Sequence, residues 1–386
     1  MRASASKRPI GAVLLLCLLL AACAAPSVPR PDFLLADAQF GPATERINAD
    51  DVLALSDAMR AYAQTEIVRR RHMRGRNGAL FDALYGQNQL KLDYDAATTR
   101  NAAQAFAARS GNCLSLVIMT AAFAKELGLQ FQYQVAIDEV AWSRVGDLYL
   151  RNGHVNLMLG NDLRLRDSAF YEPEFVIDFL PPQEIRGLRT RRIGERTVIA
   201  MFMNNRAAEA LVDGRIDDAY WWARAAIDSD AGFLNTYNTL GVVYQRHGKT
   251  QHAERAFRYV LAREPANAAA LANLAALERR QGNLTAAGAF ERELAQVEGR
   301  PPFYFFSLAQ QAMERGDYRA ARDLLAKEMD RDPYYHEFHF MLAVAEYRLG
   351  DVKRAQKELA LAQKNSATRA DRDLYAAKLA WLREHR

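Results

Sequence analysis

Cysteine is scarce in this chain, which has three among its 386 residues, at positions 17, 23 and 113. So few thiols exclude a disulfide-stapled domain. None of the cysteines, histidines and acidic residues shows the local spacing of a metal site, so we expect no metal and no cofactor.

An excess of one charge sign is also lacking once the first residues are set apart. The formal net charge is +5, but Arg2, Lys7 and Arg8 all precede the first acidic residue, Asp32, and without these three the remainder carries +2. A balance this close to zero predicts no affinity for nucleic acid. The composition, 50% apolar and 25% charged, is that of a globular protein with room for two domains.

The chain has no obvious membrane-spanning segment at its start, because the apolar run Gly11–Leu20 is too short to cross a bilayer as a permanent helix. Basic residues precede this run, as in a secretory signal. The sequence Leu20-Ala21-Ala22-Cys23 then resembles the lipobox of bacterial lipoproteins. That resemblance implies cleavage after residue 22 and acylation of Cys23, and Ala24 favours the outer membrane, facing the periplasm. A plain cleaved signal with a coincidental cysteine is the alternative.

The second half of the chain carries an internal repeat with a period of 34 residues. Glycine recurs at this interval, and alanine recurs five residues after each glycine. These positions are Gly214, Gly248, Gly282, Gly316, Gly350, Ala219, Ala253, Ala287, Ala321 and Ala355. The copy that begins at Leu234 resembles the tetratricopeptide repeat, with Gly248 at the turn, Ala253 at the close-packing point and Pro265 at the end. The resemblance implies stacked helical hairpins that bind a peptide or protein.

The concave groove of such an array is lined by the first helix of each unit. In the fourth and fifth copies this face would be apolar and aromatic, and we expect it to bind the partner. The candidate groove residues are Phe303, Phe306, Met313, Phe340 and Tyr347. The alternative is that these aromatic residues pack on each other or on the N-terminal domain.

The first half of the chain has no such period and predicts helices followed by strands, an α+β domain. The central feature is Gly111-Asn112-Cys113, followed by a segment that is apolar on nearly every face and reaches to Gly128. We expect a buried helix that begins at Cys113. A helix N-terminus favours the thiolate form of a cysteine, although an inert buried thiol is the alternative.

These residues resemble the transglutaminase-like branch of the papain-type fold over roughly residues 80–185. His154 follows Cys113 by 41 residues and Asp178 follows His154 by 24, in the order and spacing of that family. The resemblance implies a Cys-His-Asp triad that cleaves or transfers acyl groups at amide bonds. Asp167 is an alternative to Asp178 if the sheet has a different register.

Two details of the candidate site stay open at this point. The backbone N–H of Cys113 or Leu114 could supply one oxyanion donor, and Gln104 and Trp142 are candidates for a second. Many active relatives have an aromatic residue soon after the histidine, whereas Asn156 and Leu157 stand here.

The expected organisation has five parts. Residues 1–22 form the signal, 23–36 the lipidated cysteine and a tether, 37–197 the cysteine domain, 200–369 five repeats and 370–386 a capping helix. The function expected is that of a membrane-anchored cysteine peptidase or amidase that acts on a partner recruited by the repeats. The alternative is a non-catalytic assembly scaffold with a vestigial triad.

Overall fold

The structure is a computed structural model that describes residues 28–85, 90, 92–95, 98–145, 148–160, 175–178, 189–298, 303–331, 333, 335–366 and 369–384. The expected signal and Cys23 lie outside the described residues. Among the helices in these ranges, none combines the length and the apolar character needed to traverse a bilayer.

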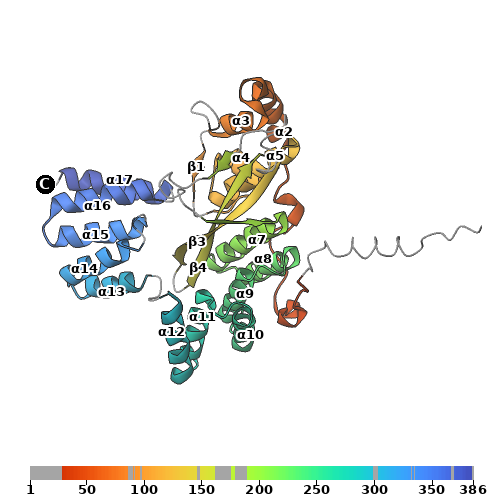
Figure 1. The fold of residues 1–386 in the computed structure, drawn as a ribbon. Helices are drawn as coiled ribbons and strands as arrows, with labels where there is room; N and C mark the ends of the chain where they lie inside the picture. The colour runs from red at the N-terminus through yellow and green to blue at the C-terminus, as the bar shows by residue number, and fades with distance from the viewer. Residues whose placement is uncertain are drawn as a thin grey trace, which may run out of the picture.

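The N-terminal part combines helices with a sheet (Figure 1). Its helices are α2 (Asp57–Tyr62), α3 (Arg71–Tyr85), α4 (Ala102–Ala108) and α5 (Cys113–Glu126), with a π-helical stretch, Ala63–Ile67, and a 3₁₀ turn, Val68–Arg70, between α2 and α3. Its strands are β1 (Asp93–Tyr94), β2 (Ser110–Gly111), β3 (Phe131–Val145), β4 (Leu148–Leu159), β5 (Phe175–Ile177) and β6 (Thr190–Ile193). Strands β3 to β6 form an antiparallel sheet in the order β5-β4-β3-β6, and β1 and β2 make a short parallel pair. Helices followed by an antiparallel sheet is the order that the sequence predicted.

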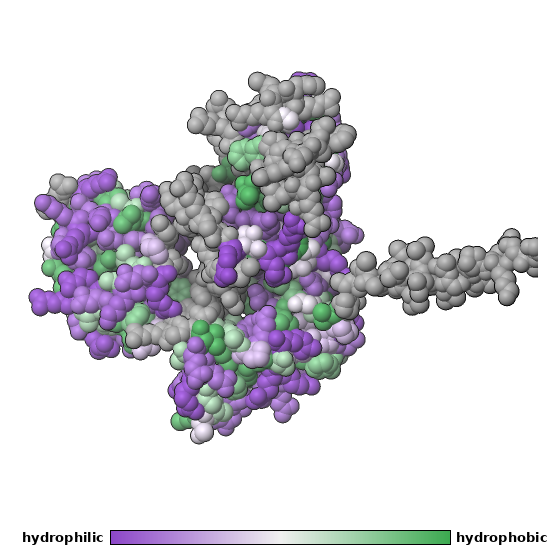
Figure 2. All heavy atoms as spheres, in the orientation of Figure 1, coloured by the Kyte–Doolittle hydropathy of each residue, from purple (hydrophilic) through white to green (hydrophobic). Residues whose placement is uncertain are grey.

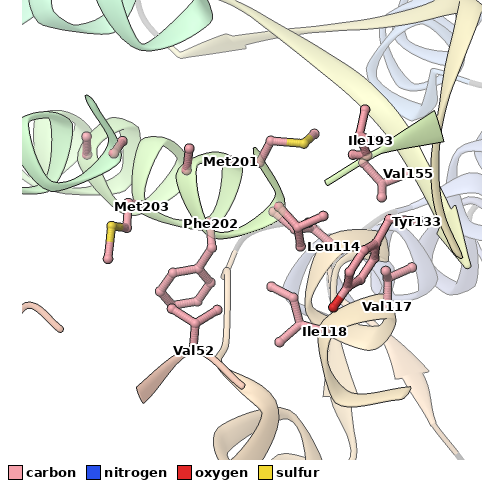
Figure 3. Packing of buried hydrophobic residues seen from close by; sticks show 14 of the residues in the cluster. Val52, Leu114, Val117, Ile118, Tyr133, Val155, Ile193, Met201, Phe202 and Met203 are labelled. Carbon is pink, nitrogen blue, oxygen red and sulfur yellow. The ribbon is translucent and has the colours of Figure 1, made fainter. Parts of the chain in front are cut away.

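Helix α5 is the centre of this part because its side chains are apolar on nearly every face. From Leu114 to Ala124 all of its residues are buried. It ends where Gly128 adopts a left-handed φ of 62°, and Leu129 N–H then donates to the Ala124 carbonyl, which closes the last turn. Figure 3 shows Leu114 of α5 between Tyr133 and Val155 of the sheet and Met201 and Phe202 of α7, with Val117 and Ile118 of α5 beside Tyr133.

The C-terminal part consists of five helical hairpins and a last helix. The helices are α7 (Glu195–Val212), α8 (Ile216–Ser229), α9 (Asn235–Arg246), α10 (Thr250–Leu261), α11 (Ala268–Arg280), α12 (Leu284–Glu298), α13 (Tyr304–Glu314), α14 (Tyr318–Met329), α15 (His336–Arg348), α16 (Val352–Asn365) and α17 (Arg369–Glu384). All five ladder glycines have a left-handed φ of 74° to 87° at the turn between the two helices of a hairpin. All five ladder alanines are completely buried. The repeat pattern in the sequence therefore reports both the turn and the packing point of each hairpin.

The two parts share one hydrophobic core, which runs without interruption from Leu34 through the sheet to Leu277 in α11. Helix α7 packs on α5 and β3, and β4 lies against α11. The first repeats are thus built onto the α+β part and do not form a separate body.

The segment before α2 packs along the first repeats. Phe40 stacks on Tyr220 of α8 with ring centroids 3.9 Å apart, and the Tyr244 hydroxyl of α9 donates to the Leu34 carbonyl over 2.6 Å. The backbone N–H and hydroxyl of Thr44 both donate to Asp218, each over 2.6 Å. Residues 34–44 therefore act as a strap across α8 and α9.

The core divides at the end of the third hairpin. The shared core ends in α11, and helices α13 to α17 have two clusters of their own, which begin at Phe303 and Ala343. Figure 1 shows α13–α17 as a block set apart from α11 and α12. Pro265 ends the second copy, and the corresponding residue of the third copy is Gly299. Gly299 lies outside the described residues.

Candidate active site

The turn before α5 fixes the position of Cys113. The Asn112 side-chain oxygen accepts from the Ser115 N–H over 2.9 Å and from the Ser115 hydroxyl over 2.8 Å, so Asn112 caps the helix. A Cβ at residue 111 would lie 2.6 Å from the Ser115 Cβ, so only glycine fits there. This Gly-Asn pair makes Cys113 the first residue of α5, where its thiol is half-buried.

The first repeat is connected to this turn by hydrogen bonds. The Asn112 amide donates to the Thr99 hydroxyl over 2.8 Å, and the Thr99 backbone N–H donates to Glu209 of α7 over 2.7 Å. Burial raises the pKa of Glu209, although hydrogen bonds from Thr99 and the charge of Arg206 act in the opposite direction. The cap of α5 is therefore connected to the repeat array through two hydrogen bonds.

His154 lies on β4 opposite an irregularity in β3. Val135 pairs with Val155 and Val140 pairs with Gly153, so four residues of β3, 136–139, face the single residue His154. Such a bulge bends a strand and redirects the side chain beside it, and bulges are common next to active sites. The His154 side chain is 5% exposed.

Asp178 is the first residue after β5, and its side chain is 1% exposed. The His154 Nε2 lies 2.7 Å from Oδ1 and 2.8 Å from Oδ2 of Asp178. A carboxylate on Nε2 fixes the orientation of the imidazole and leaves Nδ1 for another partner.

The thiol of Cys113 is also close enough to His154 to affect its charge. Burial by itself lowers the pKa of His154, but the interactions with Asp178 and with Cys113 outweigh it, so the pKa is raised from 6.5 to about 10. The imidazole is therefore protonated at neutral pH beside the sulfur. The structure brings together the three residues that the sequence singled out, Cys113, His154 and Asp178.

The other candidates of the sequence lie elsewhere. Asp167 is outside the described residues, as is the side chain of Trp142. Gln104 accepts a hydrogen bond from the Asn101 N–H over 3.1 Å and thus belongs to the capping box of α4. No residue in the described ranges accepts a hydrogen bond from the backbone N–H of Cys113 or Leu114, so both groups remain available as oxyanion donors. Within the same ranges, no group of three His, Cys, Asp or Glu side chains is arranged to hold a metal ion.

The aromatic residues expected to line a groove have different surroundings. Phe303 and Phe306 are buried, at 4% and 3% exposed, and contact Phe338 and each other. Half-buried Met313 packs against the same cluster. The groove expectation is therefore wrong for Phe303 and Phe306, because they fill the interior between the fourth hairpin and α15 of the fifth.

The last two candidates lie nearer the surface. Half-buried Phe340 stacks on Tyr375 of α17 with centroids 5.1 Å apart. Tyr347 is 39% exposed and lies beside Trp381 of α17, which is 47% exposed. In Figure 2 hydrophilic side chains predominate over this block, with apolar ones interspersed. The accessible aromatic pair of α15 and α17 is thus Tyr347 and Trp381.

Comparison with known proteins identifies the repeats. Residues 238–301 and 306–370 match the family model of the tetratricopeptide repeat. No curated protein matches the chain. Similar solved structures include pilF of Pseudomonas aeruginosa, which is 19% identical, covers 50% of this chain and 87% of its own, and has a TM-score of 0.31. Yeast Tom70 is 15% identical, covers 48% of this chain and 40% of its own, and has a TM-score of 0.34. A thermophilic TPR protein of Thermus thermophilus is 17% identical, covers 47% of this chain and 99% of its own, and has a TM-score of 0.32. Residues 238–301 and 306–370 of this chain are therefore tetratricopeptide repeats, a type of repeat that commonly provides a binding surface for proteins.

Proposed function

We propose that the chain is a periplasmic lipoprotein anchored to the outer membrane through Cys23, with a cysteine peptidase or amidase domain of the transglutaminase-like, papain-type kind. The observation that carries the enzymatic part is the position of His154, which hydrogen-bonds with Asp178 and whose pKa is raised by both Asp178 and Cys113. The anchoring part rests on the signal-like sequence before Cys23.

The chemistry proposed is acyl transfer to water through a thioester. The Cys113 thiolate attacks the carbonyl carbon of an amide, and the His154 imidazolium gives its proton to the nitrogen as the C–N bond breaks. The amine leaves, and the acyl group stays on the sulfur. Water then attacks the thioester and gives a proton to His154, and the C–S bond breaks to release the acid and restore the ion pair. Backbone N–H groups at the start of α5 stabilise the oxyanion in both steps.

The substrate class proposed is a peptide or protein that the repeats recruit. In the second repeat, Asn238 and Val242 on the first helix, α9, are buried, at 7% and 6% exposed. Recruitment through the accessible aromatic pair of α15 and α17 is better supported, since exposed aromatic side chains favour protein contacts.

A second candidate function is a non-catalytic assembly scaffold in which both parts bind and the triad is vestigial. The repeat array supports it, because such arrays bind proteins without chemistry. The presence of Asn156 where active relatives have an aromatic residue also favours it.

The reactivity of Cys113 separates the two candidates. We expect iodoacetamide to alkylate Cys113 of the wild-type protein rapidly already at pH 6, with the site identified by mass spectrometry. The His154→Ala variant should lose this reactivity, whereas Asp57→Asn, an exposed change on α2, should keep it. If wild-type Cys113 reacts only as the pH approaches about 8.5, as an ordinary thiol does, the enzymatic proposal is wrong.

Anchoring is tested independently by cell fractionation. Wild-type protein should sediment with outer membranes, and Cys23→Ser should be released. A wild-type protein that is already soluble would refute the lipidation.

A further inference from the structure

Asn156 stands out in the sequence because it replaces an aromatic residue in the segment after His154. The catalytic steps proposed above give it no role. Yet its side chain is among the most buried polar groups of the chain, at 2% exposed. A buried amide costs free energy unless its polar atoms are paired, so its partners indicate its purpose.

The strand register places Asn156 beside the triad. Leu157 of β4 pairs with Ile177 of β5, so Asn156 and Asp178 come next as directly opposed residues. Directly opposed side chains on antiparallel strands start about 5 Å apart at Cβ. Because side chains alternate along a strand, Asn156 also lies on the same face of β4 as His154.

The contacts agree with this placement. The Asn156 Nδ2 donates to Oδ2 of Asp178 over 3.0 Å, while the His154 Nε2 lies 2.7 Å from Oδ1. The carboxylate is therefore fixed from two directions by groups on one strand. The side-chain oxygen Oδ1 of Asn156, in contrast, is buried and accepts no hydrogen bond within the described structure. A residue kept for stability alone would gain more from an apolar side chain, so the bond to Asp178 is the contact that this position supplies.

We propose that Asn156 is a positioning residue of the triad, which orients the Asp178 carboxylate so that it in turn holds the imidazole of His154 against the Cys113 thiol. The inference rests on the proposed cysteine chemistry and adds a fourth member to its site. A hydrogen bond to a charged group is strong enough for its loss to change the ionisation of the site roughly 10- to 100-fold.

The test uses two variants of the full-length protein that lose the same donor. Asn156→Ala leaves space, whereas Asn156→Leu fills it, so an effect common to both comes from the lost hydrogen bond. Gln134→Ala is the matched control. Gln134 lies on β3 opposite Asn156 of β4, and its half-buried amide contacts Met158 and Thr190.

The readouts are the pH titration of the His154 imidazole by NMR, the alkylation rate of Cys113 against pH, and thermal unfolding. Among the described residues, the titratable groups that affect His154 are Asp178 after β5 and Cys113 from α5.

In both Asn156 variants we expect the imidazole midpoint to fall by about one unit or more and the alkylation rate at pH 6 to fall roughly tenfold. Gln134→Ala should change neither. Unchanged titration and alkylation would overturn the proposal, as would a lowered melting temperature without a change in either. If wild-type Cys113 behaves as an ordinary thiol, the enzymatic function fails, but the imidazole titration still reports whether Asn156 positions the Asp178–His154 pair.

Discussion

At the scale of single residues, Asp178 controls the charge of His154. The raised pKa of His154, about 10 against an ordinary 6.5, means that the folded chain holds this proton more tightly than the unfolded chain does. The resulting stabilisation is complete below pH 6.5 and is lost as the pH rises through about 10. We predict that Asp178→Asn lowers the imidazole pKa towards 6.5 and reduces the free energy of unfolding near pH 6 by roughly 3 kcal/mol.

Denaturant unfolding between pH 6 and pH 11 checks this prediction. The difference between wild type and Asp178→Asn should shrink as the pH rises through about 10, because both proteins then carry a neutral imidazole. The exposed-residue variant Asp57→Asn should follow the wild type at every pH. A difference that is constant with pH would show that Asp178 acts through packing and not through the charge of His154.

The sequence predicted Cys113, His154 and Asp178 as site residues but gave no indication of Asn156, and the difference has a physical reason. Cys113, His154 and Asp178 belong to reactive residue types whose order along the chain is informative. Asn156 is informative only once β4 and β5 are paired, because its contact with Asp178 depends on strand register. The same dependence on register left Asp167 as an alternative to Asp178 in the sequence.

At the scale of elements, the close approach of α9 and α10 depends on Gly241. A Cβ at this position would overlap the Phe257 ring, and that ring is completely buried. We predict that Gly241→Ala destabilises the protein by roughly 1–3 kcal/mol, because the ring has no free space to move into. Chemical denaturation of both proteins measures the difference.

The matched control is Gly288→Ala in α12. Its added Cβ would meet only the end of the flexible Arg292 side chain, 3.7 Å away. Alanine inside a helix is favoured over glycine by about 0.5–1 kcal/mol, so this variant should be more stable than wild type. Equal effects of the two substitutions would mean that Phe257 does not limit the helix spacing.

Periodicity predicted the repeat helices better than it predicted which of their faces stay accessible. The five hairpins follow the glycine and alanine ladders, since each ladder position has one local structural task. Phe303 and Phe306 were expected in a groove but lie in the interior, because an aromatic stripe on a helix looks the same in sequence whether it faces a ligand or the next helix. The bulge opposite His154 has no local sequence signal either.

At the scale of the whole molecule, the boundary between the parts does not follow the sequence pattern. The repeats begin a new period, yet the core continues from the sheet through α7 to α11, and the strap of residues 34–44 closes over α8 and α9. Contacts between segments this far apart in the chain leave no periodic trace in either segment. The first repeats therefore share their core with the α+β part, although they have the architecture of the repeat array.

Truncation tests this division. A chain that ends at Glu298 keeps the whole shared core and both hydrogen bonds that connect Glu209 to the cap of α5. We expect it to unfold cooperatively and to retain the wild-type alkylation rate of Cys113.

A chain that ends at Val212 loses α8 to α11 and with them buried Tyr220, Tyr237 and Leu240, so it should fail to unfold cooperatively and lose the reactivity. Circular dichroism during heating, together with alkylation of Cys113, measures both outcomes. If the chain that ends at Val212 keeps a cooperative transition and a reactive thiol, the sheet and α5 form an independent domain and the shared core is only a contact between two bodies.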